Sequence, residues 1–334
     1  MILLFCTCHL IFMLSISQLA AFYSEKFSTQ DYAREPQNLY GPMGYMMSIP
    51  GKRIRPLLLL LSSDGFGGDI EEAIFAAHAM ELFHNFTLVH DDIMDAATLR
   101  RGIATVHKQY GLNTGVLSGD ALFIYAYKYL CGIKATHLPP VLDIFNRTAI
   151  EIMEGQQMDM DFEQRLDVTI AEYLKMIGYK TSVLLACSLQ IGAILGGASA
   201  ADQSRIYDFG IKLGLSFQIK DDWLDTFGES AKVGKKAGGD IIQNKKTYLL
   251  ITLLNEANDG DKKTLLALLD EKDEQKKVSE VIALLNKYHI SEKTNEKADE
   301  LYQQALASLE SVSIPAERKA NLLAMAEMVH NREF

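Results

Sequence analysis

The sequence contains few residues that break helices or cross-link small folds. Of its 334 residues, only 7 are proline, 4 are cysteine and 1 is tryptophan. A chain this long with so little proline is compatible with one large helical bundle, so length alone does not require two domains. The four cysteines show no paired zinc-ligand spacing and do not form a disulfide framework. We therefore expect a protein of the reducing cytoplasm.

Positive charge is also scarce. Lys and Arg total 33 against 43 Asp and Glu, which gives a net charge of −10. This balance excludes binding of nucleic acid through a broadly basic surface, but it leaves room for a local basic pocket that binds a phosphate-bearing small molecule. Hydrophobic residues make up 48% of the chain, enough for a substantial core.

Residues 1–22 form an apolar leader that contains no Asp, Glu, Lys or Arg. A secretory signal would begin with a positively charged segment, which is missing here. A membrane anchor is allowed by the length, although polar residues dilute the apolar run. We favour a third interpretation, in which translation starts at Met13 and the following residues form an amphipathic opening helix. Membrane contact is expected only through this leader or a lipidic product.

Strand signals are scarce, and no alternating run is flanked by hairpin turns. Apolar residues instead recur at helical spacing, and turn signals separate these segments. The segments with helical spacing are residues 70–89, 117–131, 141–158, 173–195 and 206–224. The sequence therefore predicts a single all-α domain over residues 23–334, with long central helices buried on most sides.

Two aspartate clusters share the pattern D-D-x-x-D, and each follows a long apolar run. They are Asp91, Asp92 and Asp95 in the first cluster and Asp221, Asp222 and Asp225 in the second. On a helix this spacing gathers the carboxylates at one level of one face. Burying such like charges without cations would be very costly. A single copy could be a solvated acidic helix end, but two copies make coincidence a poor explanation.

Hard divalent cations resolve this cost. Mg²⁺ accepts carboxylate and phosphate oxygens and usually keeps some waters. Two facing clusters can therefore clamp a diphosphate through metal ions and stabilise the charge on its leaving oxygen.

Basic residues stand close to these clusters and to glycines, although each alone could be an ordinary surface charge. They are Lys52 and Arg55 in the segment Gly51–Pro56, Arg100 and Arg101, Lys180 beside Thr181 in an apolar helix, and Lys235 and Lys245. In an acidic chain, this placement makes a local phosphate site more credible.

The order and spacing of nine segments resemble the trans-isoprenyl diphosphate synthases, also called polyprenyl synthetases, from about residue 36 to the C-terminus. The segments are residues 51–56, 81–84, 90–95, 99–102, 119–120, 155–156, 180–181, 217–225 and 234–240 with 244–245. One departure is Pro50, which stands where the family often has a glycine. This puts the loop geometry in question, but not the charges.

The resemblance implies an all-α fold of the isoprenoid synthase type around a deep central cavity, usually as a homodimer. It implies that the six aspartates bind about three Mg²⁺ ions and, with Arg100 and Lys180, perform catalysis. Isopentenyl diphosphate would be held by Lys52, Arg55, His84 and Arg101. The allylic diphosphate (dimethylallyl, geranyl or farnesyl) would be held by Arg100, Lys180, Thr181, Gln218, Lys235 and Lys245. Gln156 and Asp159 match a supporting position.

The implied reaction is a Mg²⁺-dependent head-to-tail condensation of the two diphosphates. The helix before Asp91 would form one wall of the cavity, with Thr87 and Phe86 about one turn, ~5.4 Å, below the aspartates and Phe83 a turn further. These three residues are candidates for the floor that limits chain length, although buried phenylalanines are commonly ordinary core residues. The likeness suggests a C15–C20 product, with geranylgeranyl diphosphate slightly favoured.

Two alternative functions share some of these features. A class I terpene cyclase shares one D-D-x-x-D motif, but it normally has an Asn/Ser/Glu metal motif where this chain has its second aspartate cluster. A non-catalytic subunit of a heteromeric synthase typically lacks one cluster, and here both are intact.

Overall fold

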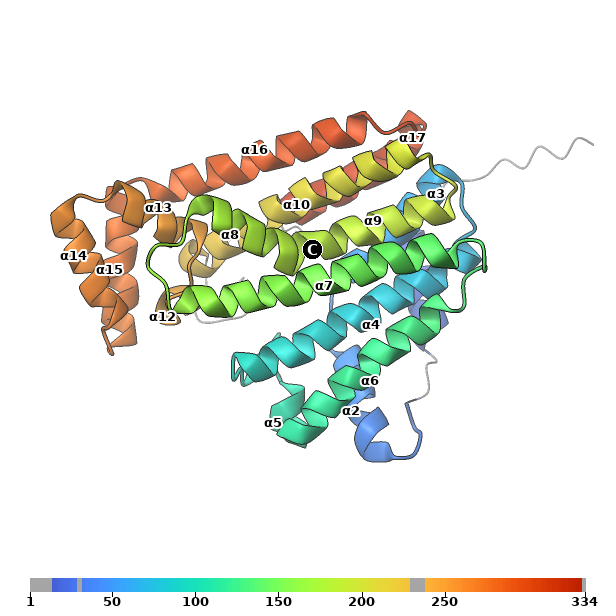
Figure 1. Cartoon of the computed structure of the whole chain (residues 1–334), viewed down its shortest axis with the longest axis horizontal. Coiled ribbons are helices and arrows are strands. Elements are labelled where there is room, and N and C mark those ends of the chain that lie inside the picture. Colours follow the sequence, from blue (N-terminus) through green and yellow to red (C-terminus); the bar gives the residue numbers. More distant parts are fainter. Residues whose placement is uncertain (1–13, 29–31, 229–237, 332–334) are drawn as a thin grey trace, which may run out of the picture.

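The protein is described by a computed structural model over residues 14–28, 32–228 and 238–331, and these residues are almost entirely helical (Figure 1). The first part contains α1 (Ile16–Ser28), α2 (Gln37–Ser48), α3 (Ile54–Phe66), α4 (Ile70–Met94), the strands β1 (Leu99–Arg100) and β2 (Ile103–Ala104), α5 (Val106–Tyr110) and α6 (Leu112–Leu130). The central part contains α7 (Leu138–Glu163), α8 (Ile170–Ile177), the π-helical turn η1 (Gly178–Ser182), α9 (Val183–Leu195) and α10 (Ala200–Phe227). The last part contains α12 (Gly239–Ile242), α13 (Tyr248–Glu256), α14 (Asp259–Leu269), α15 (Glu274–Lys287), α16 (Ile290–Glu310) and α17 (Ala316–Asn331).

The predicted all-α fold is confirmed. Four of the five predicted helical segments lie within helix, and the segment 117–131 ends one residue past α6. Long helices run side by side across the molecule, while α14 and α15 stand at one end (Figure 1). Helix α4 packs against α3 and α6, α9 packs against α3 and α10, and α10 packs along α16. The helices α4 and α10, whose C-terminal ends carry the aspartates, are therefore both central elements of the bundle.

The hairpin β1–β2 is an element that the sequence did not predict. Leu99 pairs with Ala104 and Arg100 with Ile103, in antiparallel register. The turn between them places Arg101 and Gly102 at φ values of 52° and 76°. Two successive positive φ values match the twist of a tight hairpin. A run of two residues per strand is too short for alternation to be visible in the sequence.

Residues 1–13 of the leader lie outside the described residues. Helix α1 crosses the boundary predicted at residue 22, and its residue Leu19 is fully buried in the main core. Residues 16–22 therefore pack as part of the bundle. The extent of the domain itself stays a prediction.

Two glycines bring the turn η1 into close contact with both neighbouring helices. A Cβ on Gly155 of α7 would lie 2.5 Å from the backbone nitrogen of Lys180, and a Cβ on Gly214 of α10 would lie 2.6 Å from Cα of Ser182. Only residues without a side chain permit such approach. The turn that carries Lys180 and Thr181 is thus held between α7 and the helix of the second aspartate cluster.

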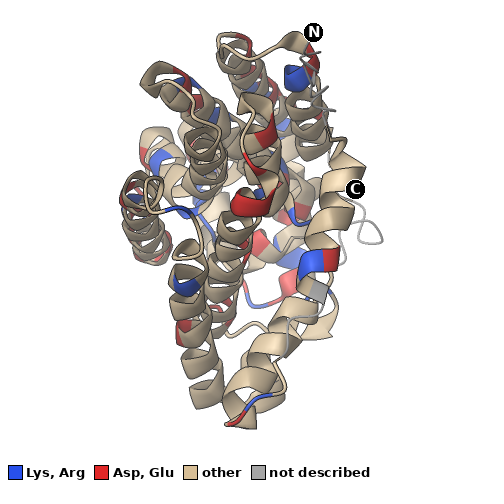
Figure 2. Ribbon diagram, turned by 90° about the vertical axis from the view of Figure 1, so that its right-hand side faces the viewer, with Lys and Arg blue, Asp and Glu red and all other residues tan. Residues whose placement is uncertain are grey.

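Acidic and basic segments are interspersed over the helices rather than separated onto two faces (Figure 2). Among the described residues, one stretch, Ile170–Leu195, is long and apolar enough to cross a membrane, and 72% of its apolar 18-residue window is buried inside the bundle. A core helix of this kind is weak evidence for a membrane span.

Candidate active site

The first aspartate cluster closes helix α4. Asp92 is only 2% exposed and accepts two hydrogen bonds from Arg100, at 2.8 Å from Nε and 2.7 Å from Nη2. Burial raises the pKa of Asp91, and Asp95 and Asp159 raise it further, whereas Lys180 and Arg100 oppose them. Because a helix C-terminus already carries partial negative charge, three carboxylates there create a strong demand for cations.

The second cluster closes helix α10 in the same way. Asp222 is buried and accepts hydrogen bonds from the Tyr173 hydroxyl at 2.7 Å and from Gln218 Nε2 at 2.9 Å. Burial raises its pKa well above the ordinary value, and the charges of Asp240 and Asp221 add to this. The backbone N–H of Asp240 donates to Asp225 at 2.8 Å, which ties the N-terminus of α12 to the cluster.

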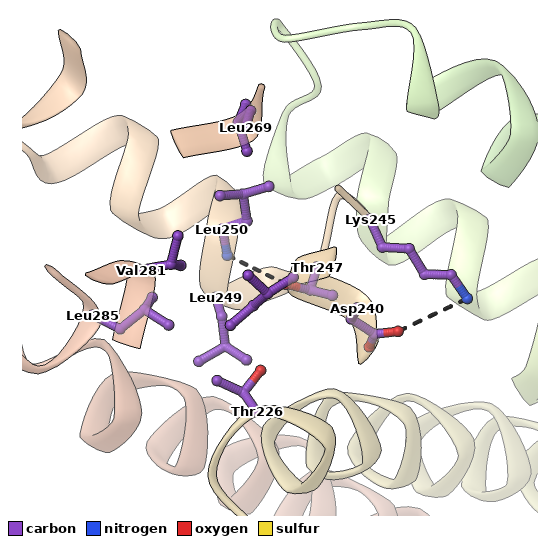
Figure 3. A pocket seen from close by; sticks show the side chains of 10 residues that line it. Thr226, Asp240, Lys245, Thr247, Leu249, Leu250, Leu269, Val281 and Leu285 are labelled. Atoms are coloured by element: carbon purple, nitrogen blue, oxygen red, sulfur yellow. Dashed lines mark hydrogen bonds and ion pairs between the residues drawn. The ribbon is translucent and has the colours of Figure 1, made fainter. Parts of the chain in front are cut away.

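The two clusters share one polar region around Lys245. Burial lowers the pKa of Lys245, but the carboxylates of Asp240, Asp95, Asp159 and Asp222 outweigh it and hold the pKa above the ordinary value. Lys245 lies 3.8 Å from Asp240, an ion pair visible in Figure 3. The ammonium group of Lys245 thus interacts electrostatically with carboxylates from α4, α7, α10 and α12. The sequence alone could not show this.

Lys180 occupies the same region from η1. Its ammonium group donates to Asp159 at 2.6 Å, and its charge also lowers the pKa of Asp91. Thr181 donates to Gln218 at 3.0 Å, so the turn η1 is linked to the residue that supports Asp222. A π-helical turn often marks a functional site, because its extra residue redirects neighbouring side chains.

A second, basic group of residues lies around His84, about two helical turns before Asp91 on α4. Arg55 Nη1 lies 3.1 Å from His84 Nε2, and the buried Nε of Arg55 has no hydrogen-bond partner. Burial and the charge of Arg101 lower the pKa of Arg55 to about 10, against the opposing effect of Glu81. Burial lowers the pKa of His84, and four arginine charges lower it further. Positively charged side chains that lie close together and are only partly paired favour the binding of an anionic ligand.

The loop before α3 completes this basic group. Arg101 Nη1 donates to the carbonyl of Pro50 at 2.6 Å, and a Cβ at Gly51 would collide with the same guanidinium. Burial lowers the pKa of Arg101, with Arg100 the next cause. Lys52 is exposed at the edge of this loop. Arg55, His84 and Arg101 are thus brought together as predicted, while the predicted ligand Lys235 lies outside the described residues.

Mg²⁺ fits the aspartates by chemistry. Among the described residues, no group of three or more His, Cys, Asp or Glu side chains already forms a metal site. Mg²⁺ does not require one, since it is usually bound by one or two carboxylates together with substrate phosphates and waters. The raised pKa values of Asp91 and Asp222 reflect burial and neighbouring carboxylates, which a hard cation would offset.

An aromatic cluster fills the space below the first aspartates. The rings of Phe83 and Phe86 lie 5.5 Å apart, and Phe86 stacks on Phe123 of α6 at 4.9 Å. Phe83 also contacts Phe145 of α7 at 5.1 Å, whereas the Thr87 hydroxyl donates to the carbonyl of His84 at 2.8 Å. The two predicted phenylalanines are therefore part of a wall shared by three helices.

Sequence reasoning missed several residues of this site. Phe123 and Phe145 gave no signal because aromatic residues on buried helices are common. Tyr173, which supports Asp222, stands 49 positions away from it in the chain. Asp240 was part of a matching segment but received no role. Gln156 contacts Met94, with Nε2 3.6 Å from the sulfur, rather than an aspartate.

A small cavity of about 20 Å³ lies behind Asp240 and Lys245 and is lined mainly by apolar residues of α13, α14 and α15 (Figure 3). This volume holds about one water molecule. It is too small for a prenyl chain, so the deep cavity implied by the resemblance stays a prediction.

An all-α bundle with paired aspartate clusters beside a basic group defines a diphosphate-processing enzyme of the helical type. The sequence matches the polyprenyl synthetase family over residues 36–285. The chain is 41% identical over 280 residues to a geranylgeranyl diphosphate synthase of Sulfolobus acidocaldarius, covering 82% of this chain and 84% of that protein. It is 37% identical over 255 residues to a geranylfarnesyl diphosphate synthase of Natronomonas pharaonis, covering 71% and 75%.

A solved structure of a geranylgeranyl pyrophosphate synthase has the same fold, with a TM-score of 0.90 and 40% identity over 96% of this chain and 99% of that one. The chain therefore belongs to the polyprenyl synthetase family and is a trans-prenyltransferase. The predicted family resemblance and enzyme class are confirmed, and neither the cyclase nor the non-catalytic subunit gains support. Prenyl diphosphate synthases generally depend on Mg²⁺.

Proposed function

We propose that this enzyme condenses isopentenyl diphosphate with an allylic diphosphate to give a C15–C20 trans-prenyl diphosphate, with geranylgeranyl diphosphate favoured. The observation that supports this most strongly is that carboxylates of both aspartate clusters act on Lys245, with a basic group around His84 on the same helix α4. One region suits a metal-bound diphosphate, and the other suits a diphosphate held directly by protein cations.

The allylic diphosphate would bind at the two aspartate clusters. Asp91, Asp92, Asp95, Asp221, Asp222 and Asp225 would hold Mg²⁺, three ions in our proposal. When bound, Mg²⁺ withdraws electron density from the oxygen at which the diphosphate leaves. Lys180 and Lys245 would add positive charge beside the departing group. Thr181 and Gln218, which are hydrogen-bonded to each other, would also bind it. Arg100 serves mainly to orient Asp92, because two of its nitrogens are bonded to that carboxylate.

Isopentenyl diphosphate belongs with Arg55, His84 and Arg101, and Lys52 adds charge at the exposed edge. Because its pKa is lowered, His84 stays neutral near pH 7 and binds by hydrogen bonding rather than by charge. By binding the diphosphate, these residues would direct the double bond of isopentenyl diphosphate toward the allylic carbon. This orientation would remove much of the barrier to condensation. The proton lost after condensation passes to the departing diphosphate, since no side-chain base stands out.

A direct assay tests this function. Purified protein with Mg²⁺, isopentenyl diphosphate and either dimethylallyl, geranyl or farnesyl diphosphate should yield mainly a C20 diphosphate, and chelation with EDTA should abolish turnover. Mass-resolved product analysis gives the chain length. Cyclised hydrocarbons as products would indicate a terpene cyclase, and no turnover with any primer would contradict the proposal.

We also propose that the enzyme is a homodimer joined through α6. Leu112, Leu117 and Ile124 leave large apolar surfaces exposed along this helix, with Ile124 63% exposed. Exposed apolar surface of this kind marks interfaces between proteins. We place the enzyme in the cytoplasm, which is supported by the free thiols of Cys131 and Cys187.

Replacing Ile124 with glutamate should convert the dimer into monomers, because two charges would be buried without partners at the centre of the interface. Light scattering after size-exclusion chromatography measures the mass. The matched control is Ile150→Glu, since this isoleucine is 59% exposed on a different helix, α7. A wild-type chain that is monomeric at micromolar concentration would disprove the dimer.

A further inference from the structure

Beneath the basic group lies a buried ion pair that has no role in the functions assigned so far. Glu81 of α4 is only 3% exposed, and its carboxylate accepts hydrogen bonds from Arg53 Nη1 and, at 3.1 Å, from Asn85 Nδ2. The second terminal nitrogen of Arg53 donates to the carbonyl of Met47 at 2.7 Å. The Arg53 guanidinium is thus bonded to α4 on one side and to the end of α2 on the other.

Arg53 adopts an unusual backbone conformation at the start of α3. Its φ and ψ are 49° and 37°, in the left-handed region that costs energy for a residue other than glycine. The bonds to Glu81 and Met47 oppose that cost by fixing the side chain toward the interior. The same turn leaves Lys52 exposed and starts the helix that carries Arg55.

Glu81 is also the acidic charge that acts on the arginines of this group. Its carboxylate raises the pKa of Arg55 and of Arg101, against burial and the neighbouring arginines. Arg101 in turn rests on the carbonyl of Pro50, three residues before Arg53. Loss of Glu81 would therefore leave the crowded arginine charges without compensation and release the loop on which Arg101 rests.

We propose that Glu81 and Arg53 form an internal ion pair that positions Lys52, Arg55 and Arg101 for the diphosphate of isopentenyl diphosphate. Arg53 is then a positioning residue and not a ligand, although it belongs to the same basic segment. This inference rests on the proposed function, because it takes the basic group to be the isopentenyl diphosphate site.

Two variants separate positioning from simple charge. Glu81→Gln removes a negative charge near an anion site, and Arg53→Met removes a positive one. If long-range charge alone mattered, Glu81→Gln would lower the KM for isopentenyl diphosphate and Arg53→Met would raise it. Positioning predicts that both raise this KM, by about 10-fold, because a small displacement of binding groups is costly. The KM for the allylic diphosphate and kcat at saturation should stay within about twofold.

Steady-state kinetics with each substrate varied in turn supply these values, and thermal melts report stability. The matched control is Glu72→Gln, a buried glutamate on the same helix that accepts from the Lys134 backbone at 2.9 Å and pairs with His137. It should lower the melting temperature and leave both KM values unchanged. If Glu81→Gln does not fold, Arg53→Lys decides instead: it keeps the charge but cannot span Glu81 and Met47, so an unchanged KM overturns the inference.

Arg55→Ala separates failure of the ion-pair role from failure of the proposed isopentenyl diphosphate site. One outcome is that Arg55→Ala greatly raises the KM for isopentenyl diphosphate, while Glu81→Gln and Arg53→Met shift this KM in opposite directions or not at all. This outcome would overturn the ion-pair role and leave the site assignment intact. An unchanged KM in Arg55→Ala would instead remove the basic group from the proposed function.

Discussion

Replacing Asp222 with asparagine should lower kcat/KM for the condensation by about 10²–10³-fold, the usual cost of removing one group that stabilises developing charge. The variant loses a carboxylate that would hold Mg²⁺ against the departing diphosphate. Its fold should survive, because the amide oxygen can still accept from Tyr173, which now bonds to Asp222 at 2.7 Å. Steady-state kinetics at fixed Mg²⁺ measure the loss.

A second measurement links this loss to the metal. Mg²⁺ together with inorganic pyrophosphate should raise the melting temperature of the wild type more than that of Asp222→Asn. Asp208→Asn is the matched control, since Asp208 lies earlier on the same helix and accepts from Lys212 and Ser308, both at 2.6 Å. The control should keep nearly full activity. An Asp222→Asn enzyme with more than half of the wild-type kcat/KM would contradict the assignment.

Replacing Phe86 with alanine should lengthen the main product by at least one C5 unit. Phe86 stacks on Phe123 and contacts Phe83, so its removal opens space below the aspartates into which a longer chain can extend. Because an isoprene unit is similar in length to one helical turn, one ring removed corresponds to about one further unit. The variant should also lose about 3–5 kcal/mol of stability, as is typical for a buried Phe→Ala change. Product analysis by mass gives the shift.

Phe209→Ala controls for a general loosening of the core. Phe209 is fully buried on α10, outside this aromatic cluster. Its replacement should lower stability by a similar amount without changing the product. If Phe86→Ala gives the wild-type distribution, Phe86 is an ordinary core residue. A longer product from Phe123→Ala would add α6 to the floor, a contribution that the sequence did not predict.

The helices could be predicted from the sequence because their causes are local. The segment that became α4 begins at Asp69, whose side chain accepts from the Glu71 backbone at 3.0 Å, and it continues with apolar residues at helical spacing. The aspartate motifs were equally visible, since D-D-x-x-D depends only on positions within one helix. The hairpin that carries Arg100 and Arg101 was missed, because two-residue strands contain no periodicity.

The order and spacing of the motifs determined the family by themselves and predicted the chemistry of the site. Only the tertiary structure decided which charges meet. Lys245, Asp95 and Asp222 are far apart in the chain but act on one another across the bundle. Likewise, the sequence cannot tell that Arg53 turns inward to Glu81 while Arg55 approaches His84. The physical reason is that charge and burial depend on distances in space, which close helix packing sets and local sequence does not record.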